Sequence, residues 1–581
     1  MSDNLLKLVV IFLLVFLNFP FTYSRNIDFV NENIQKESDC SENTLKGSKV
    51  VYLTPNFVNG KNVLTQEMLS KANTCYVIRY DYDLLNTEVI IPKGCTLDFQ
   101  GGSIRNGTII GVYTKIGTYN YAVLGTCKID GSWLCRESST LMFDKTINDN
   151  LLFVNLSKLS RAIRVYDNKE YFVTKESVRL DVDKFYAVGE KPIIHFINGD
   201  NGEFNNIGGF IFYSKDLLIE NIKFTEDFNP ETSNNHTIGS ALAQKYVTRN
   251  TNVTLRLRHC EFTGSYASSC FASSYTTDVE VSNCNFHNCY LADHAVYSSI
   301  NTCAFKIKNC KAIDVSKTTS LFKVRESPNF VLYEVDGLYA KDVASYLFHM
   351  SLITDEIDRN VNINMKRIDM IRTSDNIGNG TFALLNTGKF DGKAKVNTIR
   401  VEECNLFGGQ YNKVSGSYKE RPLFAVGSGQ SVIVKTIIGN NNHIEKLSIE
   451  QANVEKTVIN NSYYSISSPI YANDIYIEDS VVDIYRPLNY FFVRPKNVYI
   501  KNVSINGGVV YLCLNNQLHR GVNNVFSLNT CKINKLSRNV FDYKNVENPQ
   551  LIYYEEINCD IIRGNYPLVS NSNKPVILKN N

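Results

Sequence analysis

The stretch VEVSNCNF at residues 279–286 decides the fold, because it recurs along the chain. It reads apolar, any, apolar, two polar or turn residues, a small residue or Cys, any, apolar. Close copies are LLIENIKF at 217–224, LRLRHCEF at 255–262 and FKIKNCKA at 305–312. Seven weaker copies, which bring the total to eleven, follow around Asp336, Ile368, Cys404, Ala452, Ser480, Val503 and Cys531. Self-similarity of this kind indicates a repeat protein.

Each copy alternates apolar and polar residues on both sides of a short interruption. Alternation with a period of two is typical of a β-strand that buries one of its faces. The interruption changes which side faces inward, as a sharp bend between two strands does. Asn often stands at this bend, as at Asn221, Asn283, Asn309 and Asn502, and Asn tolerates the left-handed backbone of tight bends.

The spacing of the copies selects the architecture. Positions 260, 284, 310 and 336 are separated by 24, 26 and 26 residues, and later gaps are 32, 36, 48, 28, 23 and 28. Helix bundles need apolar spacings of three and four, and β-propellers need repeats of about 40–45 residues. We therefore predict an all-β fold: a right-handed parallel β-helix solenoid with an N-terminal cap and about three strands per coil.

Cys fills the small position of several copies. Of the 15 Cys, those at 260, 284, 310, 404 and 531 would stack inside the solenoid, where a thiol behaves as a small apolar group. Neighbouring Cys such as Cys284 and Cys289 lack the Cys-x-x-Cys spacing of zinc sites. We predict structural thiols, no metal site and no cofactor, and we leave open whether some Cys form disulfides.

The first residues have the layout of an export signal. Lys7 precedes an uninterrupted apolar run at 8–17, which is followed by Pro20 and by small residues up to Ser24. This order is typical of a secretory signal peptide, and the run is shorter than the roughly 20 apolar residues that span a bilayer. We predict four parts, which are a signal peptide at 1–24, an N-terminal extension at 25–75, the β-helix at 76–565 and a C-terminal tail at 566–581.

Charge and localisation narrow the partners. The 61 Lys and Arg residues nearly balance the 58 Asp and Glu residues, for a net charge of +3. Nucleic-acid binding needs a concentrated positive surface, so we expect no nucleic-acid partner. Because no later stretch could span a membrane, the mature chain is expected to be secreted, periplasmic or at the cell surface, with no integral membrane segment.

Residues 76–111 read as strand, turn, strand, glycine corner and strand, and include VIIPKGCTLDFQGGSI at 89–104. This block resembles the opening coils of right-handed parallel β-helix proteins of the pectate-lyase-like superfamily, such as secreted proteins of gut Bacteroidales and their phages. The resemblance extends over the repeat region. It implies the fold but selects no activity, because the superfamily includes polysaccharide lyases, glycoside hydrolases, pectin esterases, phage tailspikes and non-catalytic adhesins.

In this superfamily one long parallel sheet usually holds the substrate groove. Here the outward residues of four consecutive strands fall in register at Phe271, Tyr297, Lys323 and His349, with Arg325 beside Lys323. Lys323, Arg325 and His349 are candidate catalytic residues for β-elimination on an acidic sugar, since a cation neutralises the carboxylate and a Lys, Arg or His accepts the proton. Phe271 and Tyr297 are candidates for binding sugar rings by stacking.

Other interpretations of these residues stay open. Lys323 and Arg325 also fit a solvated strand face, His349 fits a surface histidine, and the pair Asp293-His294 is expected in the turn before a strand. The paired carboxylates and motifs of polygalacturonase-like hydrolases are absent from the sequence.

We predict an exported carbohydrate-active β-helix protein whose partner is a polysaccharide or a cell-surface glycan. The first hypothesis is a polysaccharide lyase. The alternatives are a non-catalytic, adhesin-like glycan-binding β-helix and a phage tailspike-like protein, and the signal peptide disfavours the tailspike.

Overall fold

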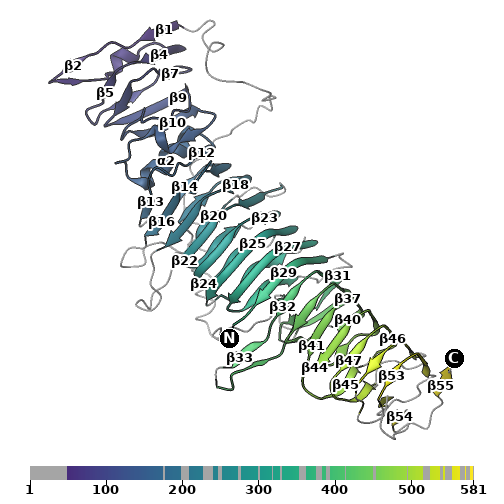
Figure 1. Ribbon diagram of the computed structural model, residues 1–581. Coiled ribbons are helices and arrows are strands. Elements are labelled where there is room, and N and C mark those ends of the chain that lie inside the picture. Colours follow the sequence, from purple (N-terminus) through teal and green to yellow (C-terminus); the bar gives the residue numbers. More distant parts are fainter. Residues whose placement is uncertain are drawn as a thin grey trace, which may run out of the picture. The chain divides into compact units, whose positions relative to one another are not determined.

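The computed structural model is built almost entirely from parallel strands stacked one above the next (Figure 1). It describes residues 49–174, 177–197, 209–226, 240–245, 252–272, 276–298, 301–316, 318–327, 330–352, 361–373, 382–387, 393–412, 414–428, 430–448, 453–493, 495–514, 524–534, 536, 541–542, 552–562, 569–570 and 576–579. The predicted signal peptide and most of the predicted C-terminal tail lie outside the described residues.

Each coil contributes three strands. In the first coils of the longest sheet, every strand pairs in parallel with the strand three places further on. The pairs are β12 (Ala162–Arg164) with β15 (Lys184–Tyr186), β13 (Tyr171–Thr174) with β16 (Ile193–Ile197), and β14 (Val178–Leu180) with β17 (Phe210–Phe212). A strand that returns to its own neighbour after three strands completes one turn of a solenoid. The predicted all-β parallel solenoid is therefore confirmed.

The cysteine positions stack as predicted. Glu261 pairs with Asn285, and Asn285 pairs with Lys311, so the preceding residues Cys260, Cys284 and Cys310 occupy the same level of three successive coils. All three thiols are buried, and every Cys that the structure describes is a free thiol. The rings of Phe224, Phe262 and Phe286 stack beside them, with centroids 5.3 and 5.2 Å apart. The core is a column of repeated side chains.

The bends follow the predicted backbone. Asn221, Asn283, Asn309 and Asn502 have φ angles of 61°, 53°, 49° and 54°. These values lie in the left-handed region, where Asn is several times more frequent than most residues. At each bend the Asn backbone N–H donates to a carbonyl of the next coil, as from Asn283 to Lys308 at 2.8 Å. The bend therefore stays inside the hydrogen-bonded stack.

Three coils were missed by the repeat pattern, and one was placed two residues early. Cys310 pairs with Leu338 rather than Asp336. Asn405 pairs with His443, His443 with Tyr463 and Lys532 with Asp560, which places coils with Asn442, Ser462 and Cys559 in the small position. The copy around Ala452 lies outside the described residues. The long gap after Cys404 is thus two ordinary coils with polar residues in the small position.

The chain before residue 135 forms a sheet of its own. Strand β1 (Lys49–Tyr52) pairs in parallel with β4 (Thr74–Ile78), and the order continues through β7 (Thr96–Phe99), β9 (Thr108–Ile116) and β10 (Lys128–Leu134). Parallel pairing therefore starts within the stretch that the sequence placed in the N-terminal extension.

Helix α2 (Asp149–Leu159) covers the first coils of the longest sheet. Its Phe153 ring lies 5.5, 5.7 and 5.0 Å from the rings of Tyr171, Phe185 and Phe210. Such a cover removes the apolar interior of a terminal coil from water.

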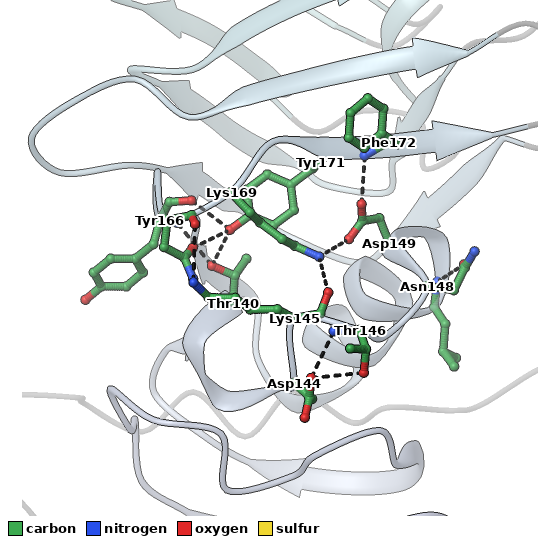
Figure 2. Close-up of polar contacts among 12 residues, drawn as sticks. Thr140, Asp144, Lys145, Thr146, Asn148, Asp149, Tyr166, Lys169, Tyr171 and Phe172 are labelled. Carbon is green, nitrogen blue, oxygen red and sulfur yellow. Dashed lines mark hydrogen bonds and ion pairs between the residues drawn. The ribbon is translucent and has the colours of Figure 1, made fainter.

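Polar contacts fix this helix in place (Figure 2). Asn148 caps it by accepting a hydrogen bond from the backbone of Leu151 at 3.2 Å. The Asp149 carboxylate contacts the Lys169 ammonium at 2.6 Å and accepts from the Phe172 backbone N–H at 2.7 Å. The helix start is thereby bonded directly to the strand that contains Tyr171. We interpret this cluster as structural, because each polar group is used to hold the helix on the coil.

No helix of the described chain is both long enough and apolar enough to cross a bilayer.

Candidate functional site

The predicted site lies on the third strand of each coil, which we call the third sheet. Its members are β20 (Ser240–Gln244), β22 (Glu261–Ala272), β24 (Asn285–Ser298), β26 (Ser320–Ser327), β28 (Tyr346–Leu352), β30 (Ala383–Asn386) and β36 (Phe424–Val426). Phe271 pairs with Tyr297, Tyr297 with Lys323, and Lys323 with His349. The predicted register is confirmed, and neighbouring members stand about 4.8 Å apart.

An aromatic pair begins this file of residues. The rings of Phe271 and Tyr297 are 5.3 Å apart and tilted by 45°. The Lys323 ammonium lies 5.3 Å from the centre of the Tyr297 ring, within the range of a cation–π interaction. All three side chains are partly exposed. A ring surface and a cation are therefore available side by side on one face of the sheet.

His349 is less accessible than its place in the file suggests. Its side chain is 9% exposed, and its Nε2 lies 3.3 Å from the Ser351 hydroxyl. Burial, assisted by the positive charge of Lys323, lowers the pKa of His349 to about 3. The imidazole is thus neutral at physiological pH, which makes Lys323 the charged member of the file.

His294 joins the site, although the sequence placed it in a turn. It lies within strand β24 and is 3% exposed. Its ring is 5.2 Å from that of Tyr297 and 6.4 Å from that of His349. Burial and the charge of Lys323 lower the pKa of His294 to about 3. The prediction was wrong because the strand continues through Asp293-His294 instead of turning there.

The tautomer of His294 follows from its contacts. Its Nδ1 lies 3.1 Å from the Ser320 carbonyl and 2.9 Å from the Ser320 hydroxyl. A carbonyl can only accept, so Nδ1 carries the proton and Nε2 is the acceptor of the neutral ring. The same interval of 26 residues that aligns Tyr297 with Lys323 aligns His294 with Ser320. A search of the positions flanking the file would therefore have found His294.

The second predicted file is only partly described. Arg325 is exposed on β26, two residues beyond Lys323, whereas Ser351 is buried. Ser273 and Ser299 lie outside the described residues. The register between β26 and β28 shifts after Val324, so Arg325 is not aligned with the His349 level as the strict repeat predicts. Arg325 adds positive charge beside Lys323.

The chemistry available to this site comes from its own side chains. Within the described part of the chain, no group of three or more His, Cys, Asp or Glu residues is placed to hold a metal ion. Lys323 and Arg325 supply positive charge, and His294 and His349 supply neutral imidazoles. Phe271 and Tyr297 supply apolar ring surface. Together these groups suit a ligand that combines a carboxylate with a flat, partly apolar ring.

Comparison with known proteins adds no family. The chain matches no protein-family model, and no curated protein matches it. The parallel β-helix architecture is what it shares with the pectate-lyase-like superfamily.

Proposed function

We propose that this chain is an exported carbohydrate-active β-helix protein that binds an acidic glycan on the third sheet. The observation that carries the proposal is the file in which Phe271, Tyr297, Lys323 and His349 occupy successive coils. A linear polymer with ring-shaped, negatively charged units presents rings and carboxylates at regular intervals. The file offers ring surface and positive charge in the same linear order.

Lys323 is the residue that takes the carboxylate. It is the charged member of the file, it is partly exposed, and the Tyr297 ring beside it supports a sugar face. Arg325 on the same strand strengthens the attraction for an anion.

Eliminative cleavage is the reaction that these residues suit best. A carboxylate paired with Lys323 makes the adjacent C–H more acidic. A neutral imidazole, at His349 or His294, accepts the proton, the bond from the neighbouring carbon to the glycosidic oxygen breaks, and a double bond forms between the two carbons. The leaving oxygen takes a proton from water. Binding of the substrate anion also offsets the Lys323 charge that lowers the pKa of both histidines, which strengthens them as bases.

Non-catalytic glycan binding is the second candidate, and one observation favours it. An imidazole whose pKa is about 3 is a weak base. If the bound anion raises these values only slightly, the file binds the glycan without cleaving it, as in an adhesin.

The test combines binding and turnover. Alginate, polygalacturonate and hyaluronate are offered to the purified protein, binding is measured by calorimetry, and the double-bond absorbance reports cleavage. Lys323→Ala is expected to lower affinity for the bound polymer at least tenfold. Lys308→Ala, on the first strand of the coil, is the matched control and is expected to bind like the wild type. Binding without absorbance supports the adhesin-like function, and equal affinity of both variants would refute the site.

Export is tested separately. When the full chain is expressed in a bacterium with a secretion pathway, the mature protein is expected to begin at Arg25, as measured by intact mass. A cytoplasmic product that retains Met1–Ser24 would contradict export and leave the glycan site to its own test.

A further inference from the structure

A second surface hollow lies far along the chain from the third-sheet file. Its volume is about 510 Å³, and it is open to solvent. The residues that line it are Glu403, Cys404, Asn405, Asn441, Asn442, His443, Asn461, Ser462, Tyr463, Asp479 and Val481. This volume lies within the range of 300–1,000 Å³ that is usual for small-molecule sites.

Four successive coils build the hollow in the same way. Each contributes a bend residue with positive φ and the first outward residue of the next strand. The bend residues are Glu403, Asn441, Asn461 and Asp479, with φ angles of 54°, 54°, 45° and 50°. The strand residues pair in the order Asn405, His443, Tyr463 and Val481. Because coils stand about 4.8 Å apart, the hollow extends along the stack and repeats its polar groups at that interval.

Two amides form the floor of the hollow. The Asn461 Nδ2 donates to the Asn441 Oδ1 at 2.6 Å. Each amide has two N–H donors and one carbonyl acceptor, so this single bond leaves the Asn441 amino group and the Asn461 carbonyl with capacity for a ligand. A floor of this kind offers donors and acceptors in alternation, which is the pattern that sugar hydroxyl pairs satisfy.

The side wall is rigid. The His443 ring stacks on the Tyr463 ring, with centroids 4.5 Å apart and planes within 19°. The His443 Nε2 lies 2.7 Å from the Glu445 carboxylate, and the Tyr463 hydroxyl donates to Asp483 at 2.7 Å. Burial and the nearby Asp483 raise the pKa of Tyr463 to about 12, so its hydroxyl stays neutral. The polar edges of the two rings are thus held in place before a ligand arrives, which lowers the entropic cost of binding.

The charge of the hollow excludes an acidic ligand. Its lining contains the carboxylates of Glu403 and Asp479, and no Lys or Arg is among the lining residues. The nearest described cation is Lys366, whose ammonium is paired with Glu403 at 3.1 Å. An anionic sugar would meet like charge here, whereas hydroxyl groups can donate to both carboxylates. This is the reverse of the electrostatics around Lys323.

We propose that this hollow binds an uncharged oligosaccharide segment that lies along the stack. The Asn441 and Asn461 amides and the two carboxylates bond its hydroxyls, and the His443–Tyr463 pair limits its orientation. The inference is independent of the proposed function of the third sheet, because it rests on different coils and the opposite charge.

The test uses calorimetry with the whole chain. The probes are cellohexaose, maltohexaose, mannohexaose and xylohexaose, with hexagalacturonate as the acidic comparison. The double variant Asn441→Gly and Asn461→Gly removes both amides and keeps the positive φ that glycine adopts freely. The matched control is Asn502→Gly, which has the same bend conformation (φ 54°) but does not line the hollow.

At least one neutral hexasaccharide is expected to bind, and the double variant is expected to weaken that binding tenfold or more. Asn502→Gly and Lys323→Ala are expected to leave it within twofold of the wild type, so failure here is distinguishable from failure of the third-sheet site. Circular dichroism of each variant verifies the fold. The inference is overturned if no neutral probe binds, if the double variant binds as tightly as the wild type, or if the loss is the same in Asn502→Gly.

Discussion

The Lys323 ammonium lies 5.3 Å from the centre of the Tyr297 ring, on the neighbouring coil of the same sheet. The contact joins the aromatic half of the file to its charged half. It also holds the Lys323 side chain over a ring instead of leaving it to extend into solvent. The ring therefore determines where the positive charge stands when an acidic glycan arrives.

Replacing Tyr297 with Leu tests this arrangement. The loss of the cation–π contact, which contributes about 0.5–1 kcal/mol at a partly exposed site, is expected to lower affinity for the acidic glycan about two- to fivefold. Calorimetry with the polymer that the wild type binds measures the change. Tyr499→Leu, on the exposed strand β46 (Asn497–Lys501), is the control. An unchanged affinity in Tyr297→Leu would show that the ring does not position the cation.

The two buried histidines predict how stability depends on pH. Both pKa values are about 3 in the folded state, against about 6.5 in an unfolded chain. Between these values the unfolded chain binds more protons than the folded one, so stability falls as the pH falls from 6.5 toward 3 and is unaffected by these groups above it. Each histidine contributes a slope of at most about 1.4 kcal/mol per pH unit.

The double variant His294→Gln and His349→Gln is therefore expected to lose less stability than the wild type between pH 6.5 and pH 4.5. Urea unfolding at a series of pH values measures the difference. The imidazole NMR signals of the folded wild type should also stay unchanged between pH 8 and pH 5. Titration of either ring within that range would contradict the burial that the structure shows.

Periodicity was sufficient to predict the coil and the file. Each coil of residues 255–350 repeats the same spacing, and cross-strand pairing must keep that register wherever one face is buried. The level of Cys260, Cys284 and Cys310 followed from this rule, and so did the alignment of Tyr297 with Lys323. What a coil buries at a given level could be read from the sequence as long as the residue was apolar.

Polar substitution hid the remaining coils. Asn442 occupies the position that Cys404 occupies one coil earlier, although its side chain is polar and only 4% exposed. Its Oδ1 accepts from the Cys404 backbone N–H at 3.0 Å, and its Nδ2 donates to the Val401 carbonyl at 2.7 Å. A buried amide is stable there because its neighbours satisfy it. Such compensation depends on residues 38 and 41 positions away and is not visible in a local pattern.

Removing this amide should cost more than removing a thiol from the same level. Asn442→Ala leaves the Cys404 N–H and the Val401 carbonyl buried without their partner, at about 1–3 kcal/mol for each unsatisfied group. We expect an unfolding free energy lower by about 2–4 kcal/mol. Cys404→Ala, which removes only a small apolar group, is the control and should cost about 1 kcal/mol. Equal losses in the two variants, measured by urea unfolding, would show that the amide is not a structural hydrogen-bonding group.

Two buried tyrosines of the N-terminal sheet region make a matched pair for the last prediction. The Tyr76 hydroxyl accepts from the Lys71 backbone N–H at 2.8 Å and donates to the Lys71 carbonyl at 2.9 Å. The Tyr82 hydroxyl is buried without a hydrogen-bond partner among the described residues, and its side chain is 0% exposed.

Tyr76→Phe is expected to destabilise the region by about 1–2 kcal/mol, because it breaks two hydrogen bonds and leaves backbone groups unpaired. Tyr82→Phe removes an unpaired polar atom from an apolar site, so stability should stay the same or rise by up to about 1 kcal/mol. Trp133, the single tryptophan of the chain, lies buried on strand β10 of the same region, so its fluorescence during urea unfolding reports both changes. A loss in Tyr82→Phe as large as that in Tyr76→Phe would mean that the Tyr82 hydroxyl is bonded in solution.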